Sequence, residues 1–234
     1  MISGGTRMVG LIGMPVAGSL SPLMQNAAFA ARALDWAYVP LPVAERELEA
    51  AVRGFAALGF AGANVTAPYK NAVAALEVVD TDAPSVNILR VVGDRVEGWT
   101  SDAAIADDLE IERPVILGDG GSATAFAHYF AKKRGLAPRM FARRGDWPPD
   151  VSDADVVVHA TSERDEVLVE LGPGQTLIDL PYPESGTARA ARAAGAAVIP
   201  GLEVLVAQGA NAFELWTGVP APLAVMRAAL GLSR

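Results

Sequence analysis

The stretch "VILGDGGSATA", residues 115–125, decides the class of fold that we predict for this chain. A short apolar run ends at Leu117, three of the next four residues are glycine, and small residues compatible with a helix continue from Ser122. In such a strand–turn–helix order the glycines let the backbone approach a ligand, and the helix N-terminus attracts a phosphate group. The pattern fits the start of a dinucleotide-binding fingerprint, but an ordinary tight turn between a strand and a helix has the same appearance.

The next apolar segment, "RMFARR" at 139–144, ends in Arg143 and Arg144. An NAD site usually has an acidic residue about 20 residues after the glycine turn, whereas arginine suits the 2′-phosphate of NADP. No residue of 139–144 is acidic, so the segment favours NADP if a dinucleotide binds. The alternative is a solvated strand end. Asp119, inside the glycine turn, would repel a pyrophosphate unless its carboxylate points away.

Apolar runs alternate with helical patterns on both sides of this stretch, which is typical of an α/β protein. In the first half, strands are predicted at 8–13, 36–43 and 60–66, in a mainly parallel sheet, with helices at 21–34 and 44–59. Residues 87–100 are predicted to form a hairpin around Gly93 and Asp94, followed by a helix that ends near residue 109. In the second half, strands are predicted at 113–117, 139–144, 154–162 and 176–183, with a helix at 121–134 and a long C-terminal helix at 201–218.

The composition excludes several classes of function. The chain has 234 residues, 51% of them hydrophobic, which is enough to bury a sizeable core. Its 19 Lys and Arg against 27 Asp and Glu give a net charge of −8, which argues against a nucleic-acid or membrane partner. The chain has no cysteine and only two histidines, so we expect no disulfide and no metal site. No leader or membrane-span pattern is present, and we expect a cytoplasmic protein.

Two groups of polar residues interrupt the apolar first half. In "GSLSPLMQNAAF", residues 18–29, Ser19 and Ser21 stand at the start of a predicted helix, where they either cap it or donate hydrogen bonds to a carboxylate. In "GANVTAPYKNA", residues 62–72, Thr66 ends a strand and Lys70 follows Pro68. A lysine in such a place acts as a proton donor or acceptor when it is partly desolvated.

These segments, in this order, resemble the shikimate dehydrogenase family over nearly the whole chain. The resemblance depends most on "GMPVAGSLSPLMQNAAF" (13–29), "GFAGANVTAPYKNAV" (59–73) and "GLEVLVAQGANAFELWTG" (201–218). It is also carried by "SVNI" (85–88), "GWTSDA" (98–103) and "DLPYPE" (179–184).

The resemblance implies two domains with a cleft between them. Residues 1–101, completed by C-terminal helices in 206–234, would bind the small anionic substrate, and residues 102–205 would form a Rossmann-like NADP-binding domain. The implied reaction is the reversible NADPH-dependent reduction of 3-dehydroshikimate to shikimate, with Lys70 and Asp102 as catalytic dyad. The implied substrate-binding residues are Ser19, Ser21, Thr66, Asn87, Tyr182 and Gln208. The candidate cofactor-binding residues are Gly118, Gly120, Gly121, Ser122, Arg143, Arg144 and Thr161.

The departures from the family pattern fall in the cofactor half. The usual Gly-Ala-Gly-Gly-Ala turn is "GDGGSA" here, the Asn-Arg-Thr segment is "ARR", and the Asn-Ala-Thr segment is "HATS". Glu203 and Val204 replace residues that the family places near the nicotinamide, and the chain is short for the family. Two alternatives therefore stay open: a relative that acts on quinate or an amino analogue, and a non-catalytic shikimate-binding protein. The sequence leaves the choice between monomer and homodimer open.

Overall fold

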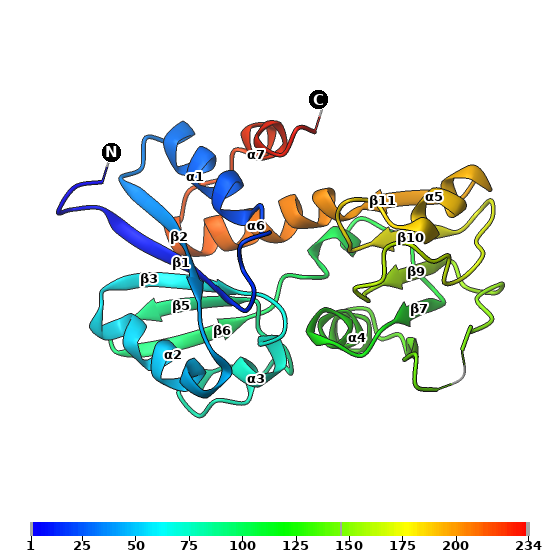
Figure 1. The fold of residues 1–234 in the computed structure, drawn as a ribbon, viewed down its shortest axis with the longest axis horizontal. Coiled ribbons are helices and arrows are strands. Elements are labelled where there is room, and N and C mark those ends of the chain that lie inside the picture. Colours follow the sequence, from blue (N-terminus) through cyan, green and yellow to red (C-terminus); the bar gives the residue numbers. More distant parts are fainter. Residues whose placement is uncertain (1, 146, 233–234) are drawn as a thin grey trace. The chain divides into compact units, whose positions relative to one another are not determined.

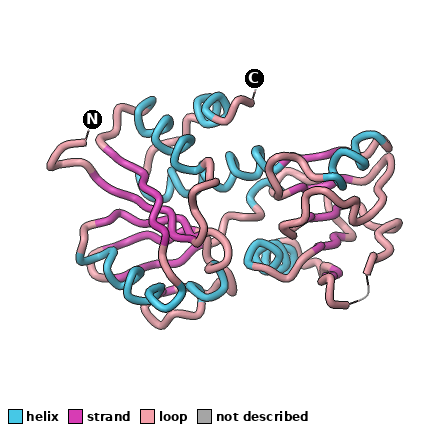
Figure 2. The backbone as a smooth tube through the Cα atoms, in the orientation of Figure 1, coloured by secondary structure: helices cyan, strands magenta, loops and turns pink. Residues whose placement is uncertain are grey.

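The computed structural model describes residues 2–145 and 147–232, which form two compact units. The first unit holds residues 1–101 together with 205–234, and the second unit holds residues 102–204. Each unit has its own sheet and its own helices, as the magenta strands and cyan helices of Figure 2 show. The predicted α/β class is confirmed.

The first unit contains a six-stranded sheet. Its strands are β1 (Arg7–Gly13), β2 (Trp36–Pro42), β3 (Phe60–Val65), β4 (Val79–Asp80), β5 (Ile88–Val92) and β6 (Arg95–Trp99). They lie in the order β2-β1-β3-β5-β6-β4 (Figure 1). The three strands predicted to be parallel pair in parallel. β5 and β6 form the predicted hairpin and are antiparallel to each other, and β5 is also antiparallel to its other neighbour, β3. The hairpin makes the sheet mixed, because a two-residue turn joins only antiparallel strands.

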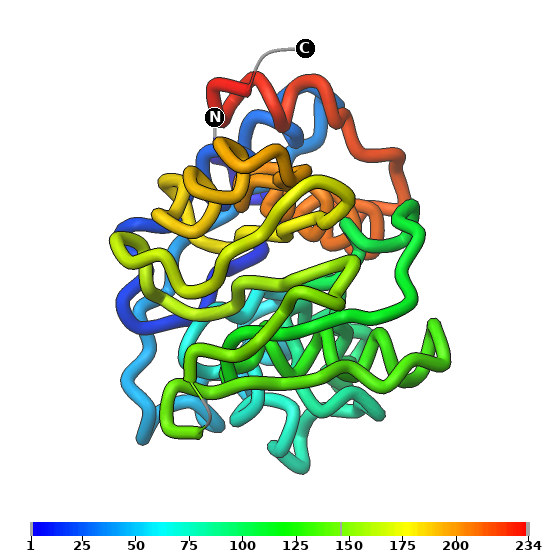
Figure 3. Tube along the Cα trace, turned by 90° about the vertical axis from the view of Figure 1, so that its right-hand side faces the viewer, coloured from blue at the N-terminus to red at the C-terminus, as the bar shows by residue number. Residues whose placement is uncertain are grey.

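Helices flank this sheet. They are α1 (Ser21–Ala31), α2 (Leu48–Ala57), α3 (Lys70–Ala74), α6 (Gly201–Thr217) and α7 (Leu223–Ala229), with a 3-10 turn at Glu45–Glu47. α6 begins in the second unit and continues into the first. α1 and α7 come from opposite ends of the chain and lie side by side (Figure 1 and Figure 3). α1 ends earlier than predicted. Ala33, just beyond it, has a φ of 52°, which is incompatible with a right-handed helix.

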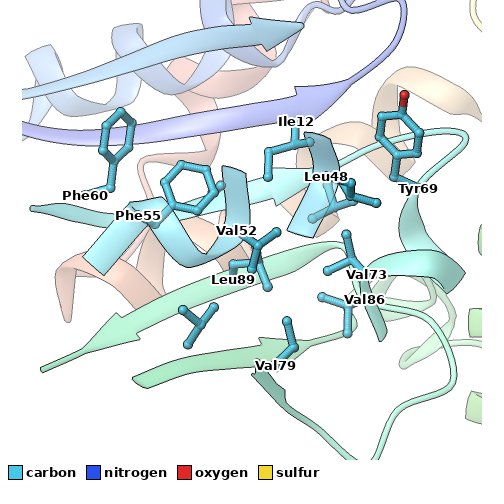
Figure 4. Packing of buried hydrophobic residues seen from close by; sticks show 13 residues of the cluster. Ile12, Leu48, Val52, Phe55, Phe60, Tyr69, Val73, Val79, Val86 and Leu89 are labelled. Carbon is cyan, nitrogen blue, oxygen red and sulfur yellow. The ribbon is translucent and has the colours of Figure 1, made fainter. Parts of the chain in front are cut away.

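One apolar cluster shows how helix spacing builds the core of the first unit. Leu48, Val52 and Phe55 recur at helical intervals along α2 and are all buried. They pack against sheet residues such as Ile12 and Leu89 (Figure 4). Burying a side chain of this size contributes about 1.5–3 kcal/mol, so this face holds α2 on the sheet.

The second unit contains a five-stranded sheet in which every strand pair is parallel. Its elements are β7 (Pro114–Leu117), β8 (Arg139–Phe141), β9 (Val156–His159), β10 (Thr176–Asp179) and β11 (Ala197–Pro200), with helices α4 (Gly121–Lys133) and α5 (Gly186–Ala193). The order is β11-β10-β9-β7-β8. The chain goes from β7 to β8 on one side and then returns to β9 on the other, so a topological switch point lies between β7 and β9. Doubly wound folds bind their ligands there, outside the carboxyl ends of the strands.

The prediction of a helix that ends near residue 109 is wrong. Only a 3-10 turn at Ala104–Ala106 forms there. Asp107, directly after this turn, still has helical backbone angles (φ −61°, ψ −38°) and accepts hydrogen bonds from Tyr129 at 2.9 Å and Lys133 at 2.6 Å, both on α4. A weak local helix preference, such as that of this segment, is readily overridden by tertiary contacts. The short strand β4 was not predicted either, because two residues carry no periodic pattern.

Gly62 in β3 allows a close approach that we expect alanine to destroy. A Cβ atom at this position would lie 2.1 Å from the carbonyl oxygen of Leu89 and 2.5 Å from Nε1 of Trp216. That indole N–H donates to the same carbonyl at 2.9 Å. Gly62→Ala is therefore expected to lower the free energy of unfolding by about 1–3 kcal/mol, measured by urea titration.

A glycine without such crowding provides the control. The nearest atom to a Cβ on Gly54, inside α2, is a methyl carbon of Leu58 at 3.9 Å. Gly54→Ala is expected to raise the free energy of unfolding by about 0.5–1 kcal/mol, because alanine is the better helix former. Equal effects of the two substitutions would contradict the packing argument.

Candidate functional site

Most of the predicted substrate-binding residues converge on one edge of the first unit's sheet. Ser19 and Ser21 follow β1, and Thr66 and Lys70 follow β3, which is parallel to β1. Asn87 precedes β5, which is antiparallel to β3, so the start of β5 lies beside the end of β3. The strand directions therefore bring five residues from three separate segments to one edge.

The two serines take different places in the chain than a simple helix cap would give them. α1 begins at Ser21 itself, and its N-cap position is Leu20, without a side-chain cap. The hydroxyl oxygen of Ser19 accepts a hydrogen bond from the backbone N–H of Ser21 at 3.3 Å. Ser21 is buried with 5% of its surface exposed. The hydroxyl of Ser21 does not cap α1, which removes the competing explanation for that residue.

Thr66 and Lys70 are fixed through their backbones. The N–H of Thr66 donates to the carbonyl of Ile12 at 2.9 Å, and a Cβ on Gly13 would lie 2.4 Å from the Thr66 methyl. Lys70 is the first residue of α3, and its carbonyl accepts from the N–H of Val86 at 3.0 Å. The Lys70 side chain is half-buried. A glycine at 13 is required for this approach of β1 to the turn that carries the lysine.

Asn87 and Gln208 meet in a buried polar network. The amide nitrogen of Asn87 donates to the Gln208 side-chain oxygen at 3.0 Å and to the Ser101 hydroxyl at 3.1 Å. The Asn87 side-chain oxygen accepts from the backbone N–H of Ser101 at 2.8 Å. Asn87 is 1% exposed, and Gln208 lies 121 residues away in the sequence. This network brings two predicted site residues together.

The same network contains residues that sequence reasoning did not assign to the site. The Tyr38 hydroxyl donates to the side-chain oxygen of Asn64 at 2.8 Å, and the Asn64 amide donates to the carbonyl of Asn87 at 2.9 Å. The sequence signal for Tyr38 and Asn64 was the presence of one side chain with a polar group inside each of two apolar strands, β2 and β3. Asn64 and Ser101 hold Asn87 in position through hydrogen bonds, and Tyr38 holds Asn64 in the same way.

In the second unit, the glycine turn has the shape that a dinucleotide needs. Gly118 has a φ of +127°, and a Cβ on it would lie 2.7 Å from the carbonyl oxygen of Ala160. Within the described residues 2–145 and 147–232, nothing lies within 4 Å of a Cβ built on Gly120, the N-cap of α4. The turn is thus tight at its start and open at the helix N-terminus, where Gly121 and Ser122 begin α4. The residues present fit a pyrophosphate group.

The two arginines lie beyond the end of β8 and are both paired with carboxylates. Arg144 contacts Asp119 at 3.3 Å, and both side chains are largely exposed. The carboxylate that would repel a pyrophosphate is therefore turned toward a guanidinium group. Arg143 pairs with Glu166 and lies 3.5 Å from Glu163.

A second buried network holds the segment after β9. The two ring nitrogens of His159 lie 2.7 Å from Asp179 and 2.7 Å from the Thr161 hydroxyl. Asp179 also accepts from the hydroxyl of Ser185 at 2.7 Å and from its backbone N–H at 3.0 Å. His159, Asp179 and Ser185 are fully buried. Thr161 is the half-buried end of this network.

Two predicted residues belong to the second unit. Asp102 is its first residue, 5% exposed, and Tyr182 follows β10 and is half-buried. The pairing of Asp102 with Lys70 and the contact of Tyr182 with a substrate in the first unit stay predictions. Over residues 2–145 and 147–232, no cluster of His, Cys, Asp and Glu is arranged to hold a metal ion. No helix in that part of the chain is long and apolar enough to cross a membrane.

The fold and these two sets of residues define a class: a two-unit α/β protein whose second unit is a Rossmann-like dinucleotide-binding fold. The substrate-binding domain model of shikimate dehydrogenase matches residues 11–89, and the C-terminal domain model of shikimate 5′-dehydrogenase matches residues 201–230. The NADP(+)-dependent shikimate dehydrogenase of Anaeromyxobacter dehalogenans (strain 2CP-C) is 39% identical, with 98% of each chain covered. The chain belongs to the shikimate dehydrogenase family.

Solved structures agree with this assignment. The shikimate dehydrogenase of Aquifex aeolicus superposes with a TM-score of 0.85 at 26% identity, covering 98% of this chain and 99% of that one. The enzyme of Thermus thermophilus, in complex with NADP(H) and shikimate, superposes with a TM-score of 0.82 at 27% identity, covering 96% and 98%. The predicted family and the Rossmann-like fold are confirmed.

Proposed function

We propose that this chain is an NADP-dependent shikimate dehydrogenase, which interconverts shikimate and 3-dehydroshikimate in the biosynthesis of chorismate and the aromatic amino acids. The observation that carries the proposal is the convergence of hydroxyl, amide and ammonium groups at one sheet edge of the first unit, in a chain of this family. A polyhydroxylated acid needs such a set of donors and acceptors, because each buried hydroxyl must find a partner.

We assign the substrate to the first unit. The hydroxyls of Ser19 and Ser21 donate to its carboxylate, and Thr66, Asn87 and Gln208 hold its ring hydroxyls. Tyr182, from the second unit, adds a further hydrogen bond to the substrate. The Asn87–Gln208 contact at 3.0 Å supports this assignment, because it places these two amide groups side by side.

We assign proton transfer to Lys70. In the direction of oxidation its amine takes the proton of the reacting hydroxyl, and in reduction it returns that proton. Asp102 orients the lysine and the substrate. NADP supplies the hydride acceptor or donor.

We assign the cofactor to the second unit. Gly118, Gly120, Gly121 and Ser122 form the turn for the pyrophosphate at the start of α4, and Thr161 lies beside that turn. Arg143 and Arg144 face the 2′-phosphate. The open space at Gly120 and the position of the turn at the β7–β9 switch point support this assignment.

Some properties of the protein follow as part of the same proposal. We place it in the cytoplasm, without a nucleic-acid or membrane partner, as a monomer or homodimer. The net charge of −8 supports the absence of a polyanionic partner.

The proposal is tested by the oxidation of shikimate and of quinate with NADP⁺ and with NAD⁺. We expect reduced cofactor to form with shikimate and NADP⁺, and kcat/KM for shikimate to exceed that for quinate by about tenfold or more. A preference for quinate would assign the protein to the alternative substrate. Shikimate binding in a calorimeter without turnover by either cofactor would assign a binding function and overturn the proposal.

A further inference from the structure

An ion pair in the second unit spans the position where the cofactor is expected. Arg143 follows β8, whereas Glu163 and Glu166 follow β9, and β7 lies between these two strands. The pair therefore connects the two neighbours of β7 across its carboxyl end. That end carries the glycine turn, and the switch point between β7 and β9 is beside it.

Both carboxylate contacts of Arg143 are made through one terminal nitrogen of its guanidinium group. One terminal nitrogen pairs with Glu166 and lies 3.5 Å from Glu163, and the guanidinium carbon lies 6.0 Å from the ring centre of Trp147. A 2′-phosphate bound to both terminal nitrogens would compete with Glu166 for this one, because guanidinium binds phosphate and carboxylate with the same geometry. Glu166 and a 2′-phosphate are thus competitors for one side chain.

The turn that presents these carboxylates is held in place. The Glu163 carboxylate accepts hydrogen bonds from the backbone N–H groups of Arg164 and Asp165 at 2.9 Å. The backbone N–H groups of Asp165 and Glu166 hold the pKa of Glu163 below its ordinary value, so the carboxylate is charged at neutral pH. The Thr161 hydroxyl oxygen, at the start of the turn, accepts a hydrogen bond from the N–H of Glu163 at 3.1 Å. The same hydroxyl is hydrogen-bonded to the buried His159.

The charges around the expected 2′-phosphate do not favour a dianion. Arg143 and Arg144 and the three carboxylates that contact them carry a formal net charge of −1. The carboxylates are Asp119, Glu163 and Glu166, and each lies within 3.5 Å of an arginine. NAD has a neutral hydroxyl at the 2′ position, so it places no additional negative charge beside these carboxylates.

We propose that Glu166 is a specificity-determining residue, which occupies Arg143 and thereby lowers the preference of this protein for NADP over NAD. This proposal rests on the proposed function, because it takes Arg143 as the group that faces the 2′-phosphate. NADP displaces Glu166 from Arg143 when it binds, and NAD leaves the ion pair closed.

The test is the affinity of both cofactors for the wild-type protein and for Glu166→Gln, measured by calorimetry at fixed, low ionic strength. Glutamine keeps the size of the side chain and removes its charge. The dissociation constant of NADP⁺ is expected to fall about three- to tenfold, while that of NAD⁺ changes less than about twofold. The gain for NADP⁺ should shrink at high salt, which screens exposed charges.

Two controls separate a direct effect from a general change of charge. Glu170→Gln removes an exposed carboxylate four residues further along, without a described contact to Arg143, and should change neither affinity. In an Arg143→Ala background, Glu166→Gln should no longer strengthen NADP⁺ binding. An unchanged ratio of the two affinities in Glu166→Gln, or the same gain in the Arg143→Ala background, would overturn the proposal. Failure of the wild-type protein to bind either cofactor would instead overturn the proposed function.

Discussion

Replacing Lys70 by alanine is expected to lower kcat for shikimate oxidation by a factor of about 10² to 10⁴, which is the usual contribution of a positioned general base. The affinity for shikimate should change much less, because the proposed hydrogen bonds to the carboxylate and ring hydroxyls come from other residues. Such a split between kcat and binding marks a group that acts mainly in the transition state. Steady-state kinetics and calorimetric titration with shikimate measure the two quantities separately.

Three further measurements make the result specific to the amine. Lys132→Ala, on the exposed end of α4, removes the same charge and should leave kcat unchanged. Added primary alkylamines should restore part of the activity of Lys70→Ala, since they replace the missing proton acceptor. The backbone of α3 should be intact by circular dichroism, because the Lys70 carbonyl contact to Val86 does not involve the side chain. A kcat within about fivefold of wild type would remove Lys70 from the chemical step.

The strands and helices were predictable where a strong pattern stands alone. "MVGLIG" became β1 and "PVIL" became β7, because apolar runs bounded by glycine or proline have few other solutions in an α/β chain. The segment after Asp102 was not predictable. Its helix preference is weak, and the side chains of Tyr129 and Lys133, which donate hydrogen bonds to Asp107, are more than 20 residues away.

The site was predictable residue by residue but not as a network. Asn87 and Gln208 were selected separately, and their contact depends on how α6 packs against the sheet. The serine pair was open to two interpretations, and the start of α1 at Ser21 excludes only a capping role of the Ser21 hydroxyl. Binding of a carboxylate by the pair stays a prediction. The pairing of Arg143 with Glu166 had no signal at all, since two charged residues 23 apart on exposed turns are common in any sequence. Local sequence identifies donors and acceptors, and tertiary packing decides which of them meet.

Replacing Asp179 by alanine is expected to lower the free energy of unfolding of the second unit by about 3–5 kcal/mol. The carboxylate accepts from Ser185 twice and contacts His159, and all three residues are fully buried. Its removal leaves these polar groups without an acceptor, and each such group costs about 1–3 kcal/mol. A domain of ordinary stability, about 5–15 kcal/mol, would lose a large share of it. Urea titration measures the total loss in the free energy of unfolding, and hydrogen exchange of β9, β10 and α5 shows where the structure is destabilised.

The position of Asp179 between two strands and a helix explains why this effect should exceed that of other aspartates. Asp153→Ala removes a carboxylate with 62% of its side chain exposed and is expected to change stability by less than about 0.5 kcal/mol. Asp179→Asn keeps one acceptor oxygen, so its loss of stability should lie between those of Asp179→Ala and Asp153→Ala. Because Thr161 is bonded to His159, loosening of this network should also weaken NADP⁺ binding in calorimetry without changing shikimate binding. A stability for Asp179→Ala within about 1 kcal/mol of wild type would show that water or another acceptor replaces the carboxylate, and that the network does not hold the cofactor turn.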